Sequence, residues 1–309
     1  MGASHMNASR AWLVARCLCT GTLALVPACA VAAAHGADAD VRGPSRHYYP
    51  LRLLPGSRLL LDARVNGHDV QALLDSAAEA TLLDVRFAQR IGLLPGEAVQ
   101  GHGSGAAAFD AQLVKGVSLE AVGVALRDQE VAVVDLADVG QRLLHRPLDV
   151  ILGRELFDAT RLEIDIGHHR IRVLPAAGQP RGERLELVPE HGVETVPVSI
   201  EGHAPVRATF DLGNGAEVLV GRRYAQQLGL ASDGRQVRRE AGGGLGGAAE
   251  RETFVLRSLV IAGRRFDNLA AAIDPQDSAS DLNVGLSVLQ HFVVTTDFPG
   301  RAVWLRQAR

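Results

Sequence analysis

Short apolar runs separated by turn residues follow one another along most of the chain. Runs of this length, rich in Val, Leu and Ile, predict β-strands, for example over residues 59–65 and 130–134. Helical patterns are rare: residues 85–91 and residues 224–228 each predict one short helix that a glycine ends. The pattern therefore predicts an all-β chain.

Two of the predicted strands end at an aspartate. Residues 71–83 read Q-A-L-L-D-S-A-A-E-A-T-L-L with the acid at Asp75, and residues 206–220 read V-R-A-T-F-D-L-G-N-G-A-E-V-L-V with the acid at Asp211. A carboxylate at the end of a buried strand is costly to desolvate unless it is hydrogen-bonded. One such aspartate most often caps its own turn, but two in matching contexts indicate that both are kept for chemistry.

The residues around each aspartate are repeated as well. After each acid comes a glycine-rich hairpin, at residues 101–105 and 242–247, and then an apolar segment with an internal glycine, at residues 150–156 and 284–289. The repeat is too long for a solenoid unit, so it indicates a duplicated domain. Two similar lobes related by a pseudo-twofold axis would bring the two aspartates face to face.

In their order, the apolar-apolar-Asp turn, the glycine-rich hairpin and the segment Ile151-Leu152-Gly153-Arg154 resemble those of retropepsin-like aspartic peptidases. The closing sequence over residues 293–305 is similar to that of bacterial members of the family. The resemblance covers nearly everything from Ser57 to Arg306. It implies an all-β, bilobal pepsin-like acid protease fold, built from two retropepsin-type β-barrel lobes in one chain.

The resemblance also implies the site. Asp75 and Asp211 would form a catalytic pair that shares one proton, since two adjacent carboxyls do not both ionise easily. One would draw a proton from a bound water while the other donates to the scissile carbonyl oxygen. The glycine-rich hairpins would be mobile flaps over an extended peptide. The residues expected to bind substrate are Ser76, Ala77, Gly103, Ser104, Gly105, Gly213, Gly243 and Gly244.

The two acid turns depart from the family's usual Asp-Thr/Ser-Gly. The first reads Asp-Ser-Ala from Asp75, and the second reads Asp-Leu-Gly from Asp211. Ser76 keeps the hydroxyl that bonds across the lobe interface in the family, whereas Leu212 cannot reciprocate, so the site is expected to be asymmetric. Because Ala78 offers no hydroxyl to the first acid, that acid should ionise less easily, which favours a working pH nearer neutral than that of the stomach enzymes.

The favoured function is hydrolysis of peptide bonds in an extended peptide or protein substrate. Two alternatives remain open: a peptide-binding pseudopeptidase with a degenerate site, and a non-hydrolytic acid/base enzyme, such as an epimerase or cyclase, that acts on a bound peptide. Leu212 favours these alternatives, while the retention of two mutually repelling acids favours an enzyme. No metal or organic cofactor is implied, because the acids activate water by themselves.

Length, charge and the N-terminal sequence set the context. A chain of 309 residues suggests two domains, and a net charge of −3 gives no reason to expect nucleic-acid binding. Residues 1–36 hold a tag-like start and then arginines, an apolar run too short for a membrane span, and small residues, which is the order of a secretory signal peptide. We expect a periplasmic or secreted protein, with lipoprotein anchoring at Cys29 as the alternative.

The predicted organisation is a tag scar and signal peptide over residues 1–36, an N-terminal arm over 37–56, a first lobe over 57–175, a linker over 176–192 and a second lobe over 193–309. The arm is expected either to add an edge strand or to be a loosely attached tail. Because both acids lie in one chain, a monomer is expected.

Overall fold

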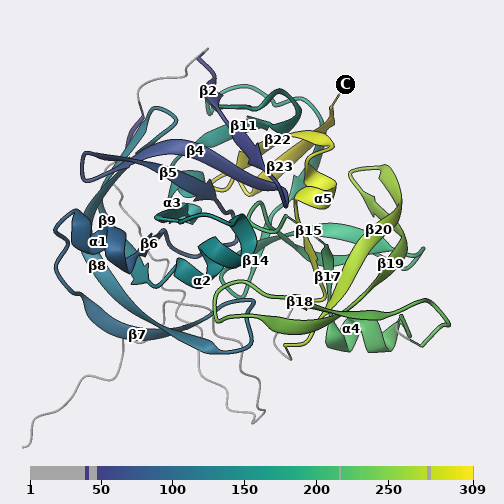
Figure 1. Cartoon of the computed structure of the whole chain (residues 1–309). Coiled ribbons are helices and arrows are strands. Elements are labelled where there is room, and N and C mark those ends of the chain that lie inside the picture. Colours follow the sequence, from purple (N-terminus) through teal and green to yellow (C-terminus); the bar gives the residue numbers. More distant parts are fainter. Residues whose placement is uncertain (1–38, 42–46, 216, 231, 277–279, 309) are drawn as a thin grey trace, which may run out of the picture.

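The computed structural model describes residues 39–41, 47–215, 217–230, 232–276 and 280–308. The predicted signal peptide over residues 1–36 lies outside these ranges. Strands dominate the described residues, and they build two lobes that lie side by side, blue to teal and green in Figure 1. The predicted all-β, bilobal architecture is confirmed.

The first lobe is a nine-stranded sheet that closes on itself. Its strand order is β1-β9-β6-β10-β5-β4-β8-β7, with β3 on the edge of β4, and a further pairing of β8 with β9 closes the barrel. The strands are β1 (Ala39–Val41), β3 (Arg52–Leu54), β4 (Arg58–Val65), β5 (His68–Leu74), β6 (Leu82–Asp84), β7 (Glu97–His102), β8 (Ala108–Ala121), β9 (Val124–Val134) and β10 (Val150–Leu152).

The second lobe repeats this topology in an eight-stranded sheet. Its order is β14-β15-β16-β21-β17-β20-β19-β18, and a pairing of β15 with β19 closes it. The strands are β14 (Val188–Glu190), β15 (Val193–Ile200), β16 (Val206–Phe210), β17 (Val218–Gly221), β18 (Arg238–Gly242), β19 (Ala249–Ile261), β20 (Arg264–Asp274) and β21 (Leu282–Val284). The duplication read from the sequence is therefore a duplication of strand order.

A third sheet of six strands joins the lobes, in the order β13-β23-β22-β11-β12-β2. Its strands are β2 (Tyr49–Pro50), β11 (Arg161–Asp165), β12 (Arg170–Leu174), β13 (Glu183–Glu186), β22 (Phe292–Asp297) and β23 (Ala302–Gln307). The last strands of each repeat pair with each other here, β11 with β22. The arm adds three strands, β1 beside β9, β2 beside β12 and β3 beside β4, so it is not a loose tail. The predicted linker contains β13 and β14.

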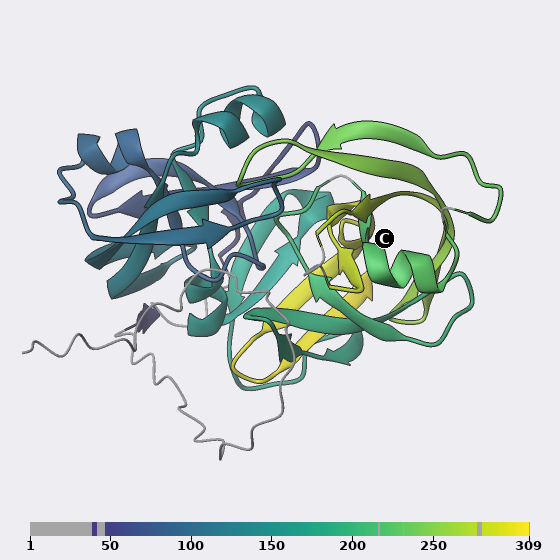
Figure 2. The ribbon, with the colours of Figure 1, turned by 90° about the horizontal axis from the view of Figure 1, so that it is seen from below.

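The helices are short and lie at the ends of strands. They are α1 (Val85–Arg90), α2 (Ala137–Val139) with the π-helix Gly140–Leu144 directly after it, α3 (Arg154–Ala159), the 3₁₀-helix Ile166–His168, α4 (Arg222–Gln227) and α5 (Leu286–Leu289). Asp84 caps α1, because its side chain accepts from the backbone N–H groups of Arg86 and Phe87. Figure 2 shows the lobes from below, with the green helix α4 on the outside of the second lobe and the yellow helix α5 between strands. None of the helices in the described part of the chain is long and apolar enough to cross a membrane.

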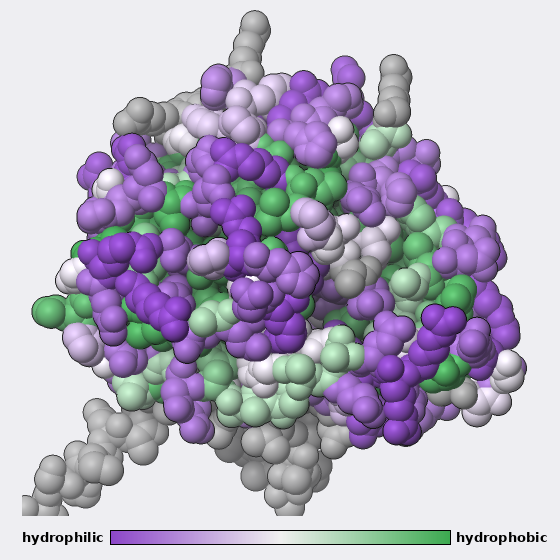
Figure 3. Space-filling model, in the orientation of Figure 1, coloured by the Kyte–Doolittle hydropathy of each residue, from purple (hydrophilic) through white to green (hydrophobic). Residues whose placement is uncertain are grey.

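One continuous apolar core runs through both barrels and the joining sheet, including Leu74 and Phe210 beside the two acids. On the face shown in Figure 3, hydrophilic side chains predominate and the hydrophobic areas between them are small.

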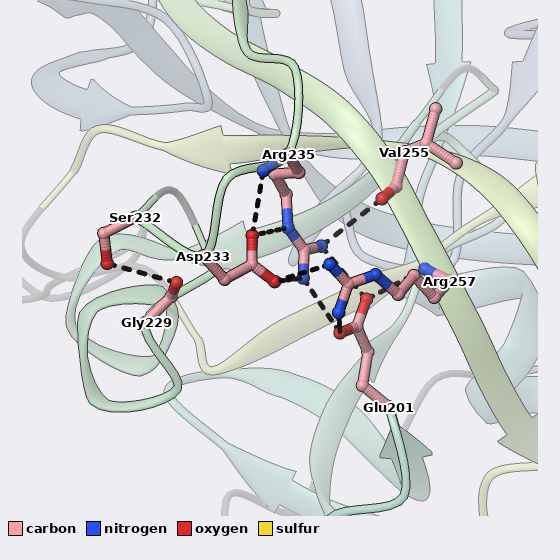
Figure 4. Close-up of polar contacts among 7 residues, drawn as sticks. All are labelled: Glu201, Gly229, Ser232, Asp233, Arg235, Val255 and Arg257. Carbon is pink, nitrogen blue, oxygen red and sulfur yellow. Dashed lines mark hydrogen bonds and ion pairs between the residues drawn. The ribbon is translucent and has the colours of Figure 1, made fainter.

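The second lobe also holds a charged cluster (Figure 4), in which Arg235 pairs with Glu201 at 2.9 Å and with Asp233 at 2.6 Å. Arg235 also stacks on Phe254, with its guanidinium carbon 5.1 Å from the ring centre. This cluster joins the turn after β15 to the segment after α4.

Candidate active site

Each aspartate is held at the end of its strand by a parallel neighbour. β5 pairs with β10 and β16 with β21. The backbone N–H of Asp75 donates to the carbonyl of Leu152 at 3.0 Å, and that of Asp211 donates to the carbonyl of Val284 at 3.1 Å. The apolar segments that the repeat predicts at residues 150–156 and 284–289 therefore lie beside the acid strands, and they hold both acids in equivalent positions.

Ser76 joins the two acid turns across the lobe interface. Its hydroxyl donates to the carbonyl of Phe210 at 2.8 Å and accepts from the N–H of Leu212 at 2.9 Å. Ser76 is 3% exposed and Leu212 is fully buried in the core. The bridge is thus one-sided, as the sequence predicts. The Ser76 hydroxyl bonds the main chain of the residues before and after Asp211, and Leu212 contributes apolar packing where a second hydroxyl would otherwise lie.

The second acid turn lies directly against the first acid. A Cβ atom at Gly213 would stand 2.3 Å from Cγ of Asp75, so no larger residue fits there without displacing the carboxyl. On the first turn, the N–H of Ala77 donates to Oδ1 of Asp75 at 2.8 Å. The glycine that the family usually has in both turns is present here where the contact with the opposite acid requires it.

The two carboxyls have unequal hydrogen-bond partners. Oδ1 of Asp211 accepts from the N–H groups of Gly213 and Asn214 at 2.8 and 2.9 Å, and its Oδ2 accepts from the side-chain amide of Asn283 at 2.7 Å. Burial raises the pKa of Asp211 above its usual value, and these three donors offset part of that increase. Desolvation first, and then the charge of Asp211, raise the pKa of Asp75 to about 7. Asp211 is therefore the acid that ionises first.

Arg58 is a charged residue next to the pair that the sequence patterns did not single out. It lies at the start of β4, is 9% exposed, and donates through Nη1 to the carbonyl of Gly56 at 2.8 Å. Burial lowers its pKa, while the charges of Asp211 and Asp75 raise it. Its own charge lowers the pKa of both acids in return, which helps to keep one of them ionised in a desolvated site.

Asn283 was also missed, although the sequence carries a signal for it. It interrupts the apolar segment Leu282–Val284 of β21, where the equivalent segment Val150–Leu152 of β10 has only apolar residues. A polar residue inside a buried strand needs a partner. Its amide oxygen accepts from the side chain of Asn214 at 2.9 Å, which orients its N–H₂ group toward Asp211.

A third residue outside the sequence prediction fixes the first acid turn. Oε1 of Glu155, on α3, accepts from the N–H of Thr81 at 2.7 Å, and Oε2 accepts from the Thr81 hydroxyl at 2.9 Å. That hydroxyl also accepts from the N–H of Gly153 at 3.1 Å. Through these contacts Thr81 and Glu155 tie the first acid turn to Gly153 and to α3.

The two glycine-rich hairpins, β7–β8 and β18–β19, meet tip to tip (Figure 1). The N–H of Gly105 donates to the carbonyl of Leu245 at 2.8 Å, and that of Ala107 donates to the carbonyl of Gly246 at 3.0 Å. Side chains from the opposite lobe hold each tip: Gln276 donates to the carbonyl of Gly105 at 2.7 Å. Arg142 makes the corresponding contacts to the carbonyls of Gly243 and Gly244. Two flaps therefore close one space above the acids.

That space is a cavity of about 290 Å³, which Asp75 and Asp211 both line. The first lobe contributes an apolar wall, made by Leu73, Leu82, Phe109, Val139, Leu143 and Ile151. The second lobe contributes polar side chains beside Leu219, namely Asn214, Arg251 and Asn283. The first lobe also contributes Arg58, Glu79 and His102, and the second also contributes Val193 and Leu245, so the apolar wall and Arg251 line one shared cavity beside the acids.

The residues expected to bind substrate fall into two groups. Those that line the cavity are Ala77, Gly103, Ser104, Gly213, Gly243 and Gly244. Ser76 lies beneath the acids instead, with its hydroxyl used between the lobes, and Gly105 is engaged in the contact between the flap tips. Among the described residues, no group of three or more His, Cys, Asp or Glu side chains is arranged to hold a metal ion.

A sequence model described as aspartyl protease matches the chain twice, over residues 61–156 and residues 196–288. The matched segments together span more than half of the chain. The first contains Asp75 and the second contains Asp211. A search of curated proteins finds no match.

Proposed function

Because this chain belongs to the aspartyl protease family, we propose that it is an aspartic peptidase that hydrolyses peptide bonds with Asp75 and Asp211 as its catalytic pair. The observation that carries the proposal is the unequal environment of two carboxyls that line one cavity. Asp211 has three hydrogen-bond donors, and its charge contributes to raising the pKa of Asp75 to about 7.

The two acids then have different roles. Asp211 is the ionised base that draws a proton from a water between the two carboxyls. Asp75 is the protonated acid that donates to the carbonyl oxygen of the scissile bond, and the water oxygen forms the new bond to the carbonyl carbon. Collapse of the tetrahedral intermediate breaks the C–N bond, with a proton passing to the leaving amine. The pair returns to its singly protonated state without any further group.

The closed flaps support an extended substrate. Their tips lie above the acids, so a peptide between flaps and acids is shielded from bulk water, and backbone groups of Gly103 and Gly243 face it in the manner of strand addition. Release of the products then requires that the hydrogen bonds of Arg142 and Gln276 to the flap tips break. We propose that the enzyme acts as a monomer and is exported, the latter because of the signal-peptide pattern in residues 1–36.

The test is digestion of a diverse peptide mixture between acidic and neutral pH by protein that begins at residue 37, with mass spectrometry of the products. Cleavage is expected for the wild type and is expected to be lost in Asp75→Asn and in Asp211→Asn. Asp62→Asn is the matched control, because its side chain is 60% exposed and pairs with Arg52 away from the cavity. Cleavage that survives in both pair variants, or no cleavage by the wild type, would refute the proposal.

A further inference from the structure

Arg251 is buried in the wall of the cavity with part of its guanidinium unpartnered. It lies on β19, in the flap of the second lobe, and is 6% exposed. Its Nη2 donates to the carbonyl of Ser104, in the tip of the opposite flap, at 3.0 Å. Its Nε is fully buried and has no hydrogen-bond partner. A buried donor left without a partner destabilises the folded state unless a ligand completes it.

Its charge is also unbalanced, in contrast to that of the other arginine of the cavity. Arg58 is stabilised by the charges of Asp211, Asp75 and Glu217. Arg251 has no carboxylate within ion-pairing distance among the residues that the structure describes. Arg251 and its chain neighbours Glu250 and Glu252 all border an outer hollow of about 590 Å³, and neither carboxylate pairs with it. In the cavity, which Asp75, Glu79 and Asp211 also line, Arg251 is therefore a cation without a directly paired carboxylate.

The guanidinium is held in place before any ligand arrives. Gly242, on β18, packs against it so closely that a Cβ atom there would lie 2.8 Å from Cδ of Arg251 and 3.3 Å from its Nε. The bond to Ser104 fixes the other end of the group. A planar guanidinium held in this way offers two parallel N–H groups to a carboxylate and loses little conformational entropy on binding.

We propose that Arg251 binds a carboxylate of the substrate and so determines specificity. The substrates are peptides that place an apolar side chain against the apolar wall of the first lobe and a carboxylate beside Arg251. That carboxylate is supplied by an Asp or Glu side chain or by the free C-terminus of the peptide. The inference rests on the proposed peptidase function and adds the class of substrate to it.

The experiment compares kcat/KM for matched peptides with Glu, Gln or Leu at each position flanking the scissile bond, with free and with amidated C-termini. The wild type is expected to prefer the carboxylate by about 10- to 100-fold, as for a charged hydrogen-bonded pair. The preference should fall to about 2-fold or less in Arg251→Met, and Arg251→Lys should retain part of it. Arg239→Met is the matched control, because Arg239 lies on the adjacent strand β18 with a side chain that is 71% exposed.

The ratio of kcat/KM between carboxylate-bearing and neutral peptides distinguishes substrate recognition by Arg251 from a purely structural role of its side chain. Loss of the bond to Ser104 alone would lower the rate on all peptides equally and leave the ratio unchanged, and that result would overturn the proposal. Equal cleavage of Glu and Gln peptides by the wild type, together with equal cleavage of peptides with free and with amidated C-termini, would also overturn it while leaving the peptidase function intact. If the wild type cleaves nothing, binding of the same labelled peptides to it is measured by fluorescence polarisation. A carboxylate preference there that Arg251→Met removes supports the inference although the peptidase function has failed, and equal binding overturns it.

Discussion

Replacing Ser76 by alanine removes a hydroxyl that joins the two lobes from beneath the acids. The carbonyl of Phe210 then loses its donor at 2.8 Å, and the N–H of Leu212 loses its acceptor at 2.9 Å. Both groups stay buried, since Leu212 and Phe210 are fully inaccessible and position 76 is 3% exposed. Each unsatisfied buried group costs about 1–3 kcal/mol, so Ser76→Ala should lower the free energy of unfolding by about 2–6 kcal/mol.

Chemical denaturation followed by fluorescence measures that loss. The melting temperature of the protein should also fall by about 4–24 °C, since 1 kcal/mol corresponds to about 2–4 °C in a domain of this length. Because the same hydroxyl holds Asp211 in register with Asp75, kcat/KM on a cleaved peptide should fall by about 10²-fold, as for small displacements of catalytic groups.

The control is Ser76→Thr, which keeps the hydroxyl. It should retain most of the stability and activity, with a loss of less than about 1.5 kcal/mol for the added methyl group. If Ser76→Ala unfolds within about 0.5 kcal/mol of the wild type, as surface substitutions do, the two bonds do not hold the lobes together and the reasoning fails.

Three further outcomes are expected. The kcat/KM of the wild type should fall as the pH rises through about 7, because Asp75 must be protonated. Asn283→Leu should move the acidic limb of the pH profile to higher pH, because it removes a donor that lowers the pKa of Asp211, the base. Gly213→Ala should reduce kcat/KM by more than about 10²-fold, because its Cβ would stand 2.3 Å from Cγ of Asp75; unchanged kinetics would show that the turn relaxes freely. Arg235→Met should lower the free energy of unfolding by about 3–5 kcal/mol, since its side chain is 6% exposed between two carboxylates, whereas Arg257→Met, with a 61% exposed side chain, should change it by less than about 1 kcal/mol.

The sequence predicted what depends on local pattern. The two strand-end acids and the two glycine-rich hairpins could be read from residue types at fixed spacing within one repeat, whereas the flap role and the one-sided Ser76 bridge were expected from the resemblance to retropepsin-like aspartic peptidases. The joining sheet could not, since the pairing of β11 with β22 brings together strands far apart in the chain. For the same reason β13 and β14, the strands within the expected linker, could not be predicted. Their sequence is charged and proline-rich, and they form strands because they pair with β23 and β15.

Partners of the acids were harder to predict than the acids. Arg58 precedes an apolar strand and looks like any strand-start arginine, and its approach to the pair depends on the meeting of two lobes. Arg251 alternates with glutamates along β19, a pattern typical of an exposed strand face. Its burial follows from the contact between the two flap tips, which no local pattern encodes.

The most direct measurement of the central claim is digestion of a cleaved peptide in water enriched in oxygen-18, with mass spectrometry of both products. If Asp75 and Asp211 activate water, each new C-terminal carboxyl should carry one solvent oxygen. The rate should fall by more than about 10²-fold in Asp75→Asn and in Asp211→Asn. An unlabelled product, a peptide altered without cleavage, or an undiminished rate in either variant would contradict the account.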